Sequence, residues 1–164
     1  RVLGQEQWDL GVDFKNDLGN ENGEGGSDEH MKHVDDFVED RWSRGRPVTD
    51  VQFSPHHKEM FLASYGQRST PELSDPDGCM LVWNLAMNTR PELTFSSPSA
   101  VLTARAHKFE PALFYGGTYS GGIVLWDARQ KAGPVLRTPL SVKGHSHPVM
   151  AMEQVGTQNA TNLV

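Results

Sequence analysis

The sequence predicts an all-β fold, and three observations lead to this prediction. From Phe37 onward, short apolar runs alternate with Pro, Gly, Ser and Asp, and no segment keeps the 3.6-residue period of an amphipathic helix. The same succession of three segments occurs twice, and each third segment contains a tryptophan, Trp83 or Trp126. These tryptophans are 43 residues apart, which is within the period of a four-stranded propeller blade. We therefore expect part of a β-propeller.

The repeat divides the chain into blades. The first copy holds the segments VTDVQFSP, MFLASYG and DGCMLVWNL, and the second holds AVLTARAH, ALFYGGTYS and GGIVLWDAR. A third copy begins at GHSHPVMAM. The expected divisions are an acidic, mostly disordered linker (1–36) and a partial propeller (37–164), with blade one at about 48–97, blade two at about 98–142 and the start of blade three at about 143–164.

The third segment of each copy has the pattern of a strand that is buried on both faces. Met80–Trp83 and Ile123–Trp126 are continuous apolar runs, as expected where neighbouring blades cover both sides of a sheet. An indole buries a large area, so Trp83 and Trp126 are expected in the core rather than on a stacking platform for a ligand. The shorter and more polar segment ELTF that follows the first run fits an outer edge strand.

The glycine-rich stretch GGTYSGG before the second run is predicted to turn between two strands. A P-loop would place Lys and then Ser or Thr directly after its last glycine, but apolar residues follow Gly122. A nucleophile elbow would need serine where Tyr119 stands. Gly121 here and Gly78 in the first copy instead allow tight turns at low steric cost.

Two features outside the strands are candidates for contacts. The loop Gly66–Pro76, which contains Arg68, is longer than its counterpart in the second copy, and propeller loops commonly carry binding. An unused insertion is the alternative. Trp42 stands among charged residues, where the pattern does not dictate burial, so it is either a partner contact or an anchor that ties the preceding segment to the sheets.

Composition favours an intracellular, soluble protein. The chain has one cysteine, Cys79, no basic-then-apolar leader and no apolar run approaching the ~18 residues of a membrane span. The net charge of −6 is uneven: residues 1–40 hold twelve acidic and three basic residues, whereas 41–164 hold nine and twelve. The scattered basic residues do not form the dense stripe that nucleic-acid binding requires.

The N-terminal region is expected to differ from the rest. Residues 15–36 are rich in Gly, Asn, Asp and Glu, which predicts a flexible linker. Before it, Trp8, Leu10, Val12 and Phe14 alternate as in a half-buried strand, or form a peptide that orders only with its partner. Because it starts at Arg1 and stops without a terminating signal, we expect the chain to be an internal fragment.

The seven histidines raise the possibility of a metal site. His145 and His147 would share a face of a strand, and His56 and His57 are adjacent. A zinc site needs three or four ligands, and no third ligand stands at a recognisable spacing. A hydrogen-bonded role within a blade for His145, and a solvated turn for His56 and His57, are therefore the favoured interpretations.

The dipeptides Gly144-His145 and Trp126-Asp127 resemble the GH and WD dipeptides of WD40 repeats. More specific motifs resemble cytoplasmic dynein intermediate chains: EDRWSRGRPVT, LASY, DGCMLVWN, GGTYSGGIVLWDAR, RTPLS, HSHPV and VGTQNATNL. The resemblance extends over residues 39–164, and generic WD40 proteins do not share RTPLS or VGTQNA. Blades one and two lack the GH dipeptide at their starts, so their His-Ser/Thr-Asp-Trp sets are incomplete.

The resemblance implies a non-catalytic scaffold without cofactors in the cytoplasmic, microtubule-associated dynein complex. The propeller is expected to bind the dynein heavy chain in microtubule-based transport, and regions upstream of this chain to bind light chains and dynactin within an intermediate-chain dimer. Neither nucleic acid nor a membrane is an expected partner. The candidate partner-binding residues are Trp42, Tyr65, Arg68, Tyr119, Arg137 and His147, and the candidate structural residues are Gly78, Trp83, Gly121, Trp126, Asp127 and His145.

Two other functions remain open at this stage. The first is a general WD40 recognition module, such as a substrate receptor or a chromatin adaptor, that reads a peptide at the central face of the propeller. The second is a metal-dependent hydrolase that uses His145 and His147. Copurifying partners distinguish the first alternative from the dynein scaffold, and elemental analysis tests the second.

Overall fold

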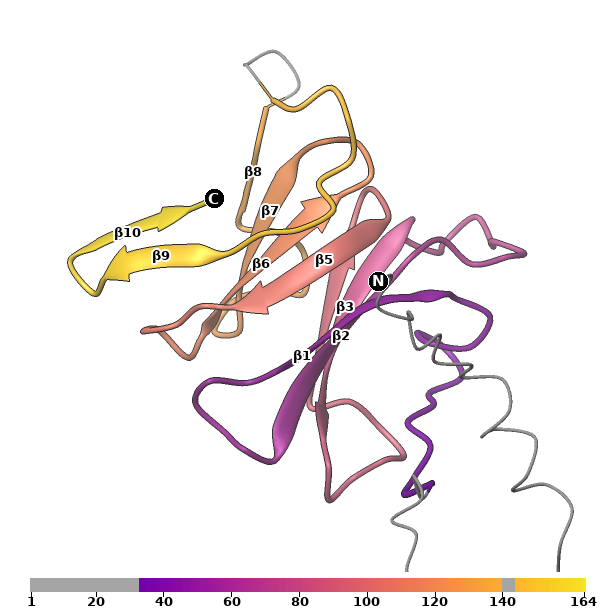
Figure 1. The fold of residues 1–164 in the computed structure, drawn as a ribbon. Coiled ribbons are helices and arrows are strands. Elements are labelled where there is room, and N and C mark those ends of the chain that lie inside the picture. The colour runs from indigo at the N-terminus through magenta and orange to yellow at the C-terminus, as the bar shows by residue number, and fades with distance from the viewer. Residues whose placement is uncertain (1–32, 140–143) are drawn as a thin grey trace, which may run out of the picture. The chain divides into compact units, whose positions relative to one another are not determined.

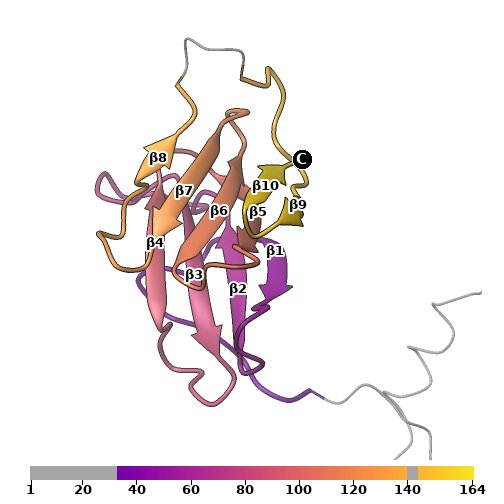
Figure 2. The same ribbon diagram turned by 90° about the vertical axis from the view of Figure 1, so that its left-hand side faces the viewer.

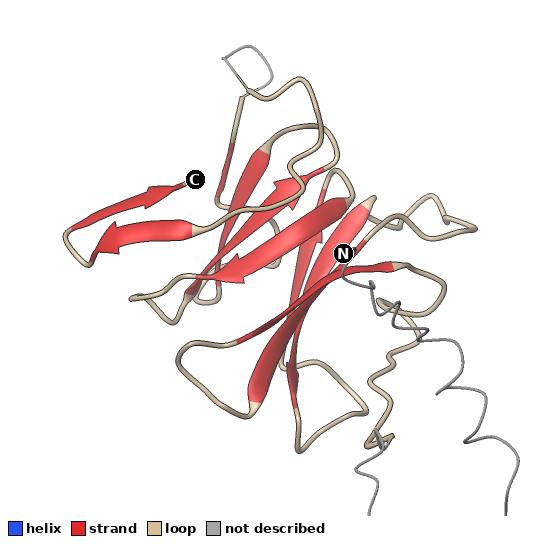
Figure 3. Cartoon of the chain, in the orientation of Figure 1, coloured by secondary structure: helices blue, strands red, loops and turns tan. Residues whose placement is uncertain are grey.

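The computed structural model describes residues 33–139 and 144–164. The chain divides into two compact units, Arg1–Val34 and Asp35–Val164, and all strands of the described residues lie in the second. The described residues form strands, turns and loops without a helix (Figure 3), and none of their segments is a helix that could cross a membrane. The alternating segment around Trp8 and most of the expected linker lie outside the described residues.

Two four-stranded antiparallel sheets form the body of the second unit (Figure 1), and in each sheet the strands follow one another in chain order. The all-β fold class and the partial propeller are therefore confirmed. The first sheet consists of β1 (Val48–Phe53), β2 (Met60–Tyr65), β3 (Gly78–Asn84) and β4 (Leu93–Ser97). The second consists of β5 (Val101–Ala106), β6 (Leu113–Thr118), β7 (Ile123–Asp127) and β8 (Leu136–Arg137).

The two sheets repeat one another in register as well as in order. Trp83 on β3 pairs with Phe61, and Trp126 on β7 pairs with Phe114. The first strand of each sheet also has a shift in register near its start, after Val48 in β1 and after Val101 in β5. The sequence repeat is therefore a repeat of backbone geometry.

A continuous apolar core joins the two sheets, and β5 lies along β1 and β2 (Figure 2). Trp126 is fully buried there, and its indole N–H donates to the carbonyl of Ser96 on the first sheet at 2.9 Å. Burying each large apolar side chain contributes about 1.5–3 kcal/mol, so this interface is a main source of stability. The core residues are Leu62, Met80, Val82, Phe95, Val101, Ala104, Phe114, Val124 and Trp126.

The segment before β1 covers a second apolar cluster on the first sheet, which contains Trp83. Phe37 meets the Trp83 ring edge-to-face at 5.7 Å, and Trp42 packs against the same cluster. Trp42 precedes Val48 by six residues, as Phe95 precedes Val101, and Phe95 lies 5.8 Å from the Trp126 ring. The segment thus covers Trp83 much as the first sheet covers Trp126.

The third copy of the repeat forms a two-stranded hairpin, β9 (Gln154–Thr157) and β10 (Ala160–Leu163). Residues 144–153 have no regular structure, although the sequence repeat begins there. They still pack on the second sheet, because Val149 and Met152 are buried and the Val149 N–H donates to the Thr118 carbonyl at 3.1 Å. This arrangement is the start of a third blade.

Candidate partner-binding surface

Strand pairing defines one end of the sheets as the candidate surface. Because β2 ends at Tyr65 and Gly78 pairs with Ser97, the loop of residues 66–77 and the loop of residues 98–100 emerge at the same end. The turn of residues 119–122 lies beside them, since the Tyr119 N–H donates to the Ala100 carbonyl at 2.9 Å. We call this end, with residues 66–77, 98–100, 119–122 and 137–139, the long-loop end. The candidate partner-binding residues lie at it or beside it: Trp42, Tyr65, Arg68, Tyr119, Arg137 and His147.

The long loop is held in place by two arginines. The Arg46 guanidinium is buried and donates to the carbonyls of Gly66 at 3.0 Å and Pro76 at 2.7 Å, which ties the two ends of the loop together. Arg68 forms an ion pair with Asp75 at 3.0 Å and donates to the carbonyl of Arg41. Charge-assisted hydrogen bonds of this kind are stronger than neutral ones, so the loop is an ordered structure. Its tip exposes Leu73 completely.

Two of the candidate contact residues have internal roles. Tyr65 is buried, and its hydroxyl accepts a hydrogen bond from the Trp83 indole at 3.3 Å. Burial raises the pKa of Tyr65. Trp42 is half-buried, its carbonyl faces the Cys79 thiol at 3.6 Å, and the Arg41 guanidinium lies 5.2 Å from its ring. This position fits the anchor interpretation of Trp42.

The remaining candidates, Tyr119, Arg137 and His147, are exposed at the long-loop end of the second sheet. Tyr119 is 65% exposed. Gly121 has a φ of +81°, and a Cβ there would lie 2.0 Å from the His145 carbonyl oxygen, so only glycine fits. The His145 side chain is exposed, and its backbone, rather than its imidazole, meets this turn.

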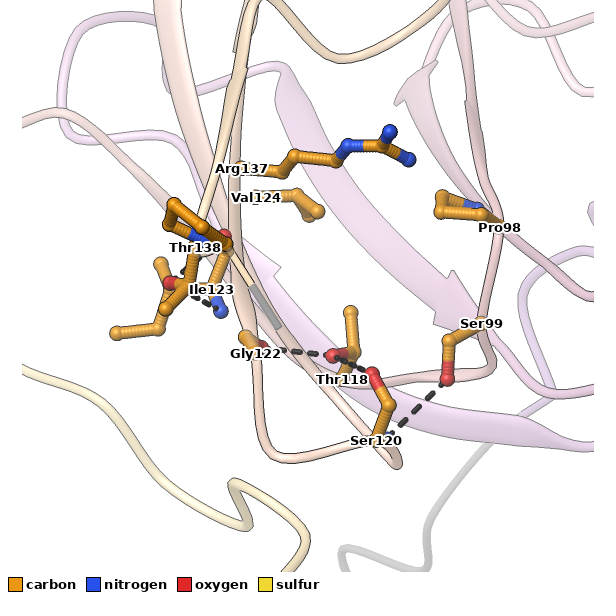
Figure 4. Close-up of a pocket in the computed structure, with 10 residues that line it drawn as sticks. Pro98, Ser99, Thr118, Ser120, Gly122, Ile123, Val124, Arg137 and Thr138 are labelled. Carbon is orange, nitrogen blue, oxygen red and sulfur yellow. Dashed lines mark hydrogen bonds between the residues drawn. The ribbon is translucent and has the colours of Figure 1, made fainter. Parts of the chain in front are cut away.

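A cavity of about 570 Å³ opens at the long-loop end, at the seam between the sheets (Figure 4). Its walls combine hydroxyls, aliphatic side chains and one cation. The Ser120 N–H donates to the Ser99 hydroxyl oxygen at 3.2 Å, and the Thr118 hydroxyl donates to the Gly122 carbonyl at 2.7 Å. The lining residues are Pro98, Ser99, Thr118, Ser120, Gly122, Ile123, Val124, Arg137, Thr138 and Pro139.

The other candidate structural residues lie at strand ends. A Cβ on Gly78 would lie 2.3 Å from the Ser99 carbonyl oxygen, so the loop of residues 98–100 passes directly over β3. Asp127 ends β7 and accepts two hydrogen bonds at 2.9 Å from the Arg129 guanidinium. These hydrogen bonds hold the pKa of Asp127 below its usual range.

Sequence reasoning missed the polar contacts that link the first strands of successive blades. The Asp50 carboxylate accepts hydrogen bonds from the Thr103 hydroxyl at 2.8 Å and from Arg105 at 2.6 Å. Burial raises the pKa of Asp50, but these hydrogen bonds outweigh it and hold the pKa below its usual value. The available signal was the presence of charged residues, Asp50 and Arg105, within the first expected strand of each copy, where a half-buried charge needs a partner.

A histidine chain was also missed. His57 is exposed, as expected of a solvated turn, but His56 is half-buried and its Nε2 lies 2.9 Å from the His107 carbonyl. His107 in turn faces the Gln154 amide at 3.1 Å. Among residues 33–139 and 144–164, no group of three or more His, Cys, Asp or Glu side chains is placed to hold a metal ion.

Comparison with known proteins confirms the resemblance that the motifs indicate. The chain is 45% identical over 130 residues to the cytoplasmic dynein 1 intermediate chain of Drosophila melanogaster, and this match covers 78% of the chain. It spans about a fifth of the length of that relative, since the match covers 20% of it. No protein-family model matches the chain.

Proposed function

We propose that this chain is a segment of a cytoplasmic dynein intermediate chain and acts as a non-catalytic scaffold subunit of the motor complex. Its propeller would bind the tail of the dynein heavy chain, in the cytoplasm and on microtubules. The observation that carries the proposal is the 45% identity over 130 residues to a dynein intermediate chain. In this proposal residues 37–164 belong to the propeller and residues 1–36 to a linker.

The geometry supports a binding role because it provides a rigid platform with ordered loops. The sheets share one apolar core, and the buried Arg46 fixes the ends of the loop of residues 66–77. Loops on a rigid scaffold are where binding residues concentrate. The heavy chain would be the partner of this platform, whereas light chains and dynactin would bind upstream, within a dimer of intermediate chains.

Copurification tests the proposal. We expect the full-length intermediate chain to retain the heavy-chain tail, and a variant without its propeller to lose the tail but keep the light chains. Retention of light chains in the same sample is the control that the variant is intact. If the propeller instead recovers ubiquitin-ligase components or histones and no heavy chain, the protein is a general WD40 recognition module and the proposal is wrong.

A further inference from the structure

We propose that the cavity at the seam of the two sheets binds an acidic side chain of a partner peptide, a carboxylate that stands next to an aliphatic residue. The inference concerns the site's own chemistry and does not depend on which protein supplies the peptide. It rests on the charge of Arg137, the free hydroxyl of Ser99 and the aliphatic wall of the cavity.

Arg137 provides a cation that the described part of the chain does not neutralise. Arg41, Arg44, Arg46, Arg68, Arg105 and Arg129 all engage a carboxylate, a carbonyl or an aromatic ring. The Arg137 side chain has no such partner within residues 33–139 and 144–164, and Figure 4 shows its guanidinium reaching across the cavity toward Pro98. A guanidinium offers five N–H donors in a planar fork that matches a carboxylate.

The hydroxyls of Thr118, Ser120 and Ser99, which line the cavity, leave one donor without an acceptor among the described residues. The Thr118 hydroxyl proton is used at the Gly122 carbonyl, so the Ser120 hydroxyl donates to Thr118 across their 3.0 Å contact. Ser99 only accepts, from the Ser120 N–H, and its own proton has no acceptor among the described residues. In this proposal the carboxylate pairs with Arg137, and the Ser99 hydroxyl offers a second donor to the polar atoms of the bound peptide.

The rest of the wall is aliphatic. Ile123, Val124, Pro98 and Pro139 line the cavity, and Val124 pairs directly with Arg137 across β7 and β8. Apolar surface of this kind favours an aliphatic side chain next to the acid. A phosphate would carry nearly two charges, and Arg137 is the only charged residue among the described residues that line the cavity, so a carboxylate is the better electrostatic match.

The described residues that line the site belong to these two sheets and their connections. One wall comes from the connection between β4 and β5, and the rest from the end of β6, the β6–β7 turn, β7, β8 and residues 138–139. The hairpin β9–β10 contributes no residue to it. Further blades of a propeller would stack beyond that hairpin, so the cavity stays open to a partner.

A peptide array tests the proposal. Degenerate decapeptides with a fixed central pair, Glu-Leu, Gln-Leu, Glu-Ser or phosphoserine-Leu, are probed with the purified full-length protein. We expect the Glu-Leu set to bind about fivefold more protein than the Gln-Leu set, an ion-pair effect of about 1 kcal/mol. Arg137→Gln should abolish this preference, and 0.5 M salt should reduce it.

Lys58→Gln is the matched control, because Lys58 is exposed in the loop between β1 and β2, at the opposite end of the sheet. It should keep the preference for Glu-Leu. An unchanged thermal midpoint for both variants shows that they fold. The proposal is overturned if the wild type does not discriminate between Glu-Leu and Gln-Leu, if it prefers phosphoserine, or if Arg137→Gln binds like the wild type.

Discussion

At the scale of single residues, Asp50 carries much of the polar contact between the two sheets. Its carboxylate lies on β1 and bonds three donors of β5: the Thr103 hydroxyl, the Ala104 N–H and Arg105. Buried or half-buried charges stabilise only when their partners are present, because a lone charge loses its hydration without compensation. Asp50 and Arg105 therefore depend on one another.

We expect Asp50→Asn to destabilise the protein by about 1–3 kcal/mol, the usual cost of breaking hydrogen bonds to a charged group. The pKa of Asp50 is lowered in the folded protein, so its contribution is present above the unfolded value of about 3.9 and is lost as pH falls through the lower folded value. Urea denaturation of the full-length chain between pH 7 and 3 measures both effects. A variant as stable as the wild type at pH 7 would contradict the expectation.

Gly116 on β6 illustrates a steric constraint. A Cβ there would lie 2.4 Å from the ring of Trp126, which is fully buried and cannot move away freely. We expect Gly116→Ala to cost about 1–3 kcal/mol, the range for overpacking a core. Gly133→Ala is the matched control, because a Cβ at Gly133 meets nothing within 4 Å. Equal denaturation midpoints for the two variants would show that the core yields more easily than we infer.

At the scale of elements, the sequence predicted the strands well and the segment before them poorly. The apolar pattern of the strands occurs twice, with Trp83 and Trp126 at equivalent positions. The strand-like pattern and its repetition therefore support the same prediction. Phe37 and Trp42 stand among charged residues, and no periodic pattern predicts that they pack against the cluster that contains Trp83. Trp42 precedes Val48 by the same number of residues as Phe95 precedes Val101. This equal spacing is present in the sequence, but its meaning is clear only once the structure shows that both rings pack on a buried cluster.

At the candidate surface, too, the sequence predicted some features and not others. The sequence alone shows that the loop 66–76 is longer than its counterpart, but the buried Arg46 that ties its ends together comes from a distant segment. In the sequence, Tyr65 is not distinguished from other aromatic residues at strand ends. The structure shows that it is buried and that its hydroxyl accepts a hydrogen bond from the Trp83 indole. Contacts between distant residues depend on packing, which local sequence patterns do not encode.

Replacing Phe37 tests the role of the segment before β1. Its ring lies 4.9 Å from Phe61 and 5.7 Å from Trp83, and each such aromatic pair contributes about 0.5–1.5 kcal/mol beyond area burial. We expect Phe37→Ala to speed amide exchange in β3 and lower stability by about 1–3 kcal/mol. Val38→Ala, at an exposed neighbour, is the control. Unchanged exchange in β3 would mean that the segment does not protect Trp83.

The turn between β5 and β6 depends on a neutral histidine. His107 Nδ1 accepts hydrogen bonds from the N–H groups of Phe109 and Glu110 at 3.0 and 2.8 Å, which a protonated Nδ1 cannot do. Burial, with a smaller opposing effect of Glu110 and support from His56, lowers the pKa of His107. The folded state therefore disfavours the proton, and stability is full above the unfolded value of about 6.5 and falls as pH drops below it.

We expect His107→Asn to remove this part of the pH dependence. The Asn side-chain oxygen can accept the backbone N–H two residues on and does not titrate. Denaturation midpoints of the full-length wild type and variant at pH 7.5 and 5.5 isolate the effect from that of other histidines. An identical loss of stability in both proteins at pH 5.5 would rule out His107 as the source.

At the scale of the whole molecule, the third strand is more completely buried in the first sheet than in the second. Six of the seven residues of β3 are buried, whereas two of the five residues of β7, Ile123 and Leu125, are only half-buried. The reason is coverage: β3 lies between the segment before β1 and the second sheet, but β7 has only residues 144–153 and the hairpin β9–β10 beyond it. A blade is thus complete only when sheets lie on both sides.

This asymmetry predicts how residues 35–164 behave when they are produced alone. Phe53 on β1 and Met150 before β9 are 59% and 72% exposed, and the edge strands are β1 and β4 in the first sheet and β5 and β8 in the second. Exposed apolar surface beside free strand edges promotes association. We expect these residues to self-associate or to melt without a cooperative transition, as measured by sedimentation and calorimetry. A chain that continues through the remaining blades should instead have a monomeric propeller, because ring closure covers the apolar surfaces around Phe53 and Met150. Cooperative melting of a soluble monomer of residues 35–164 would show that two sheets and a hairpin are sufficient for a stable fold.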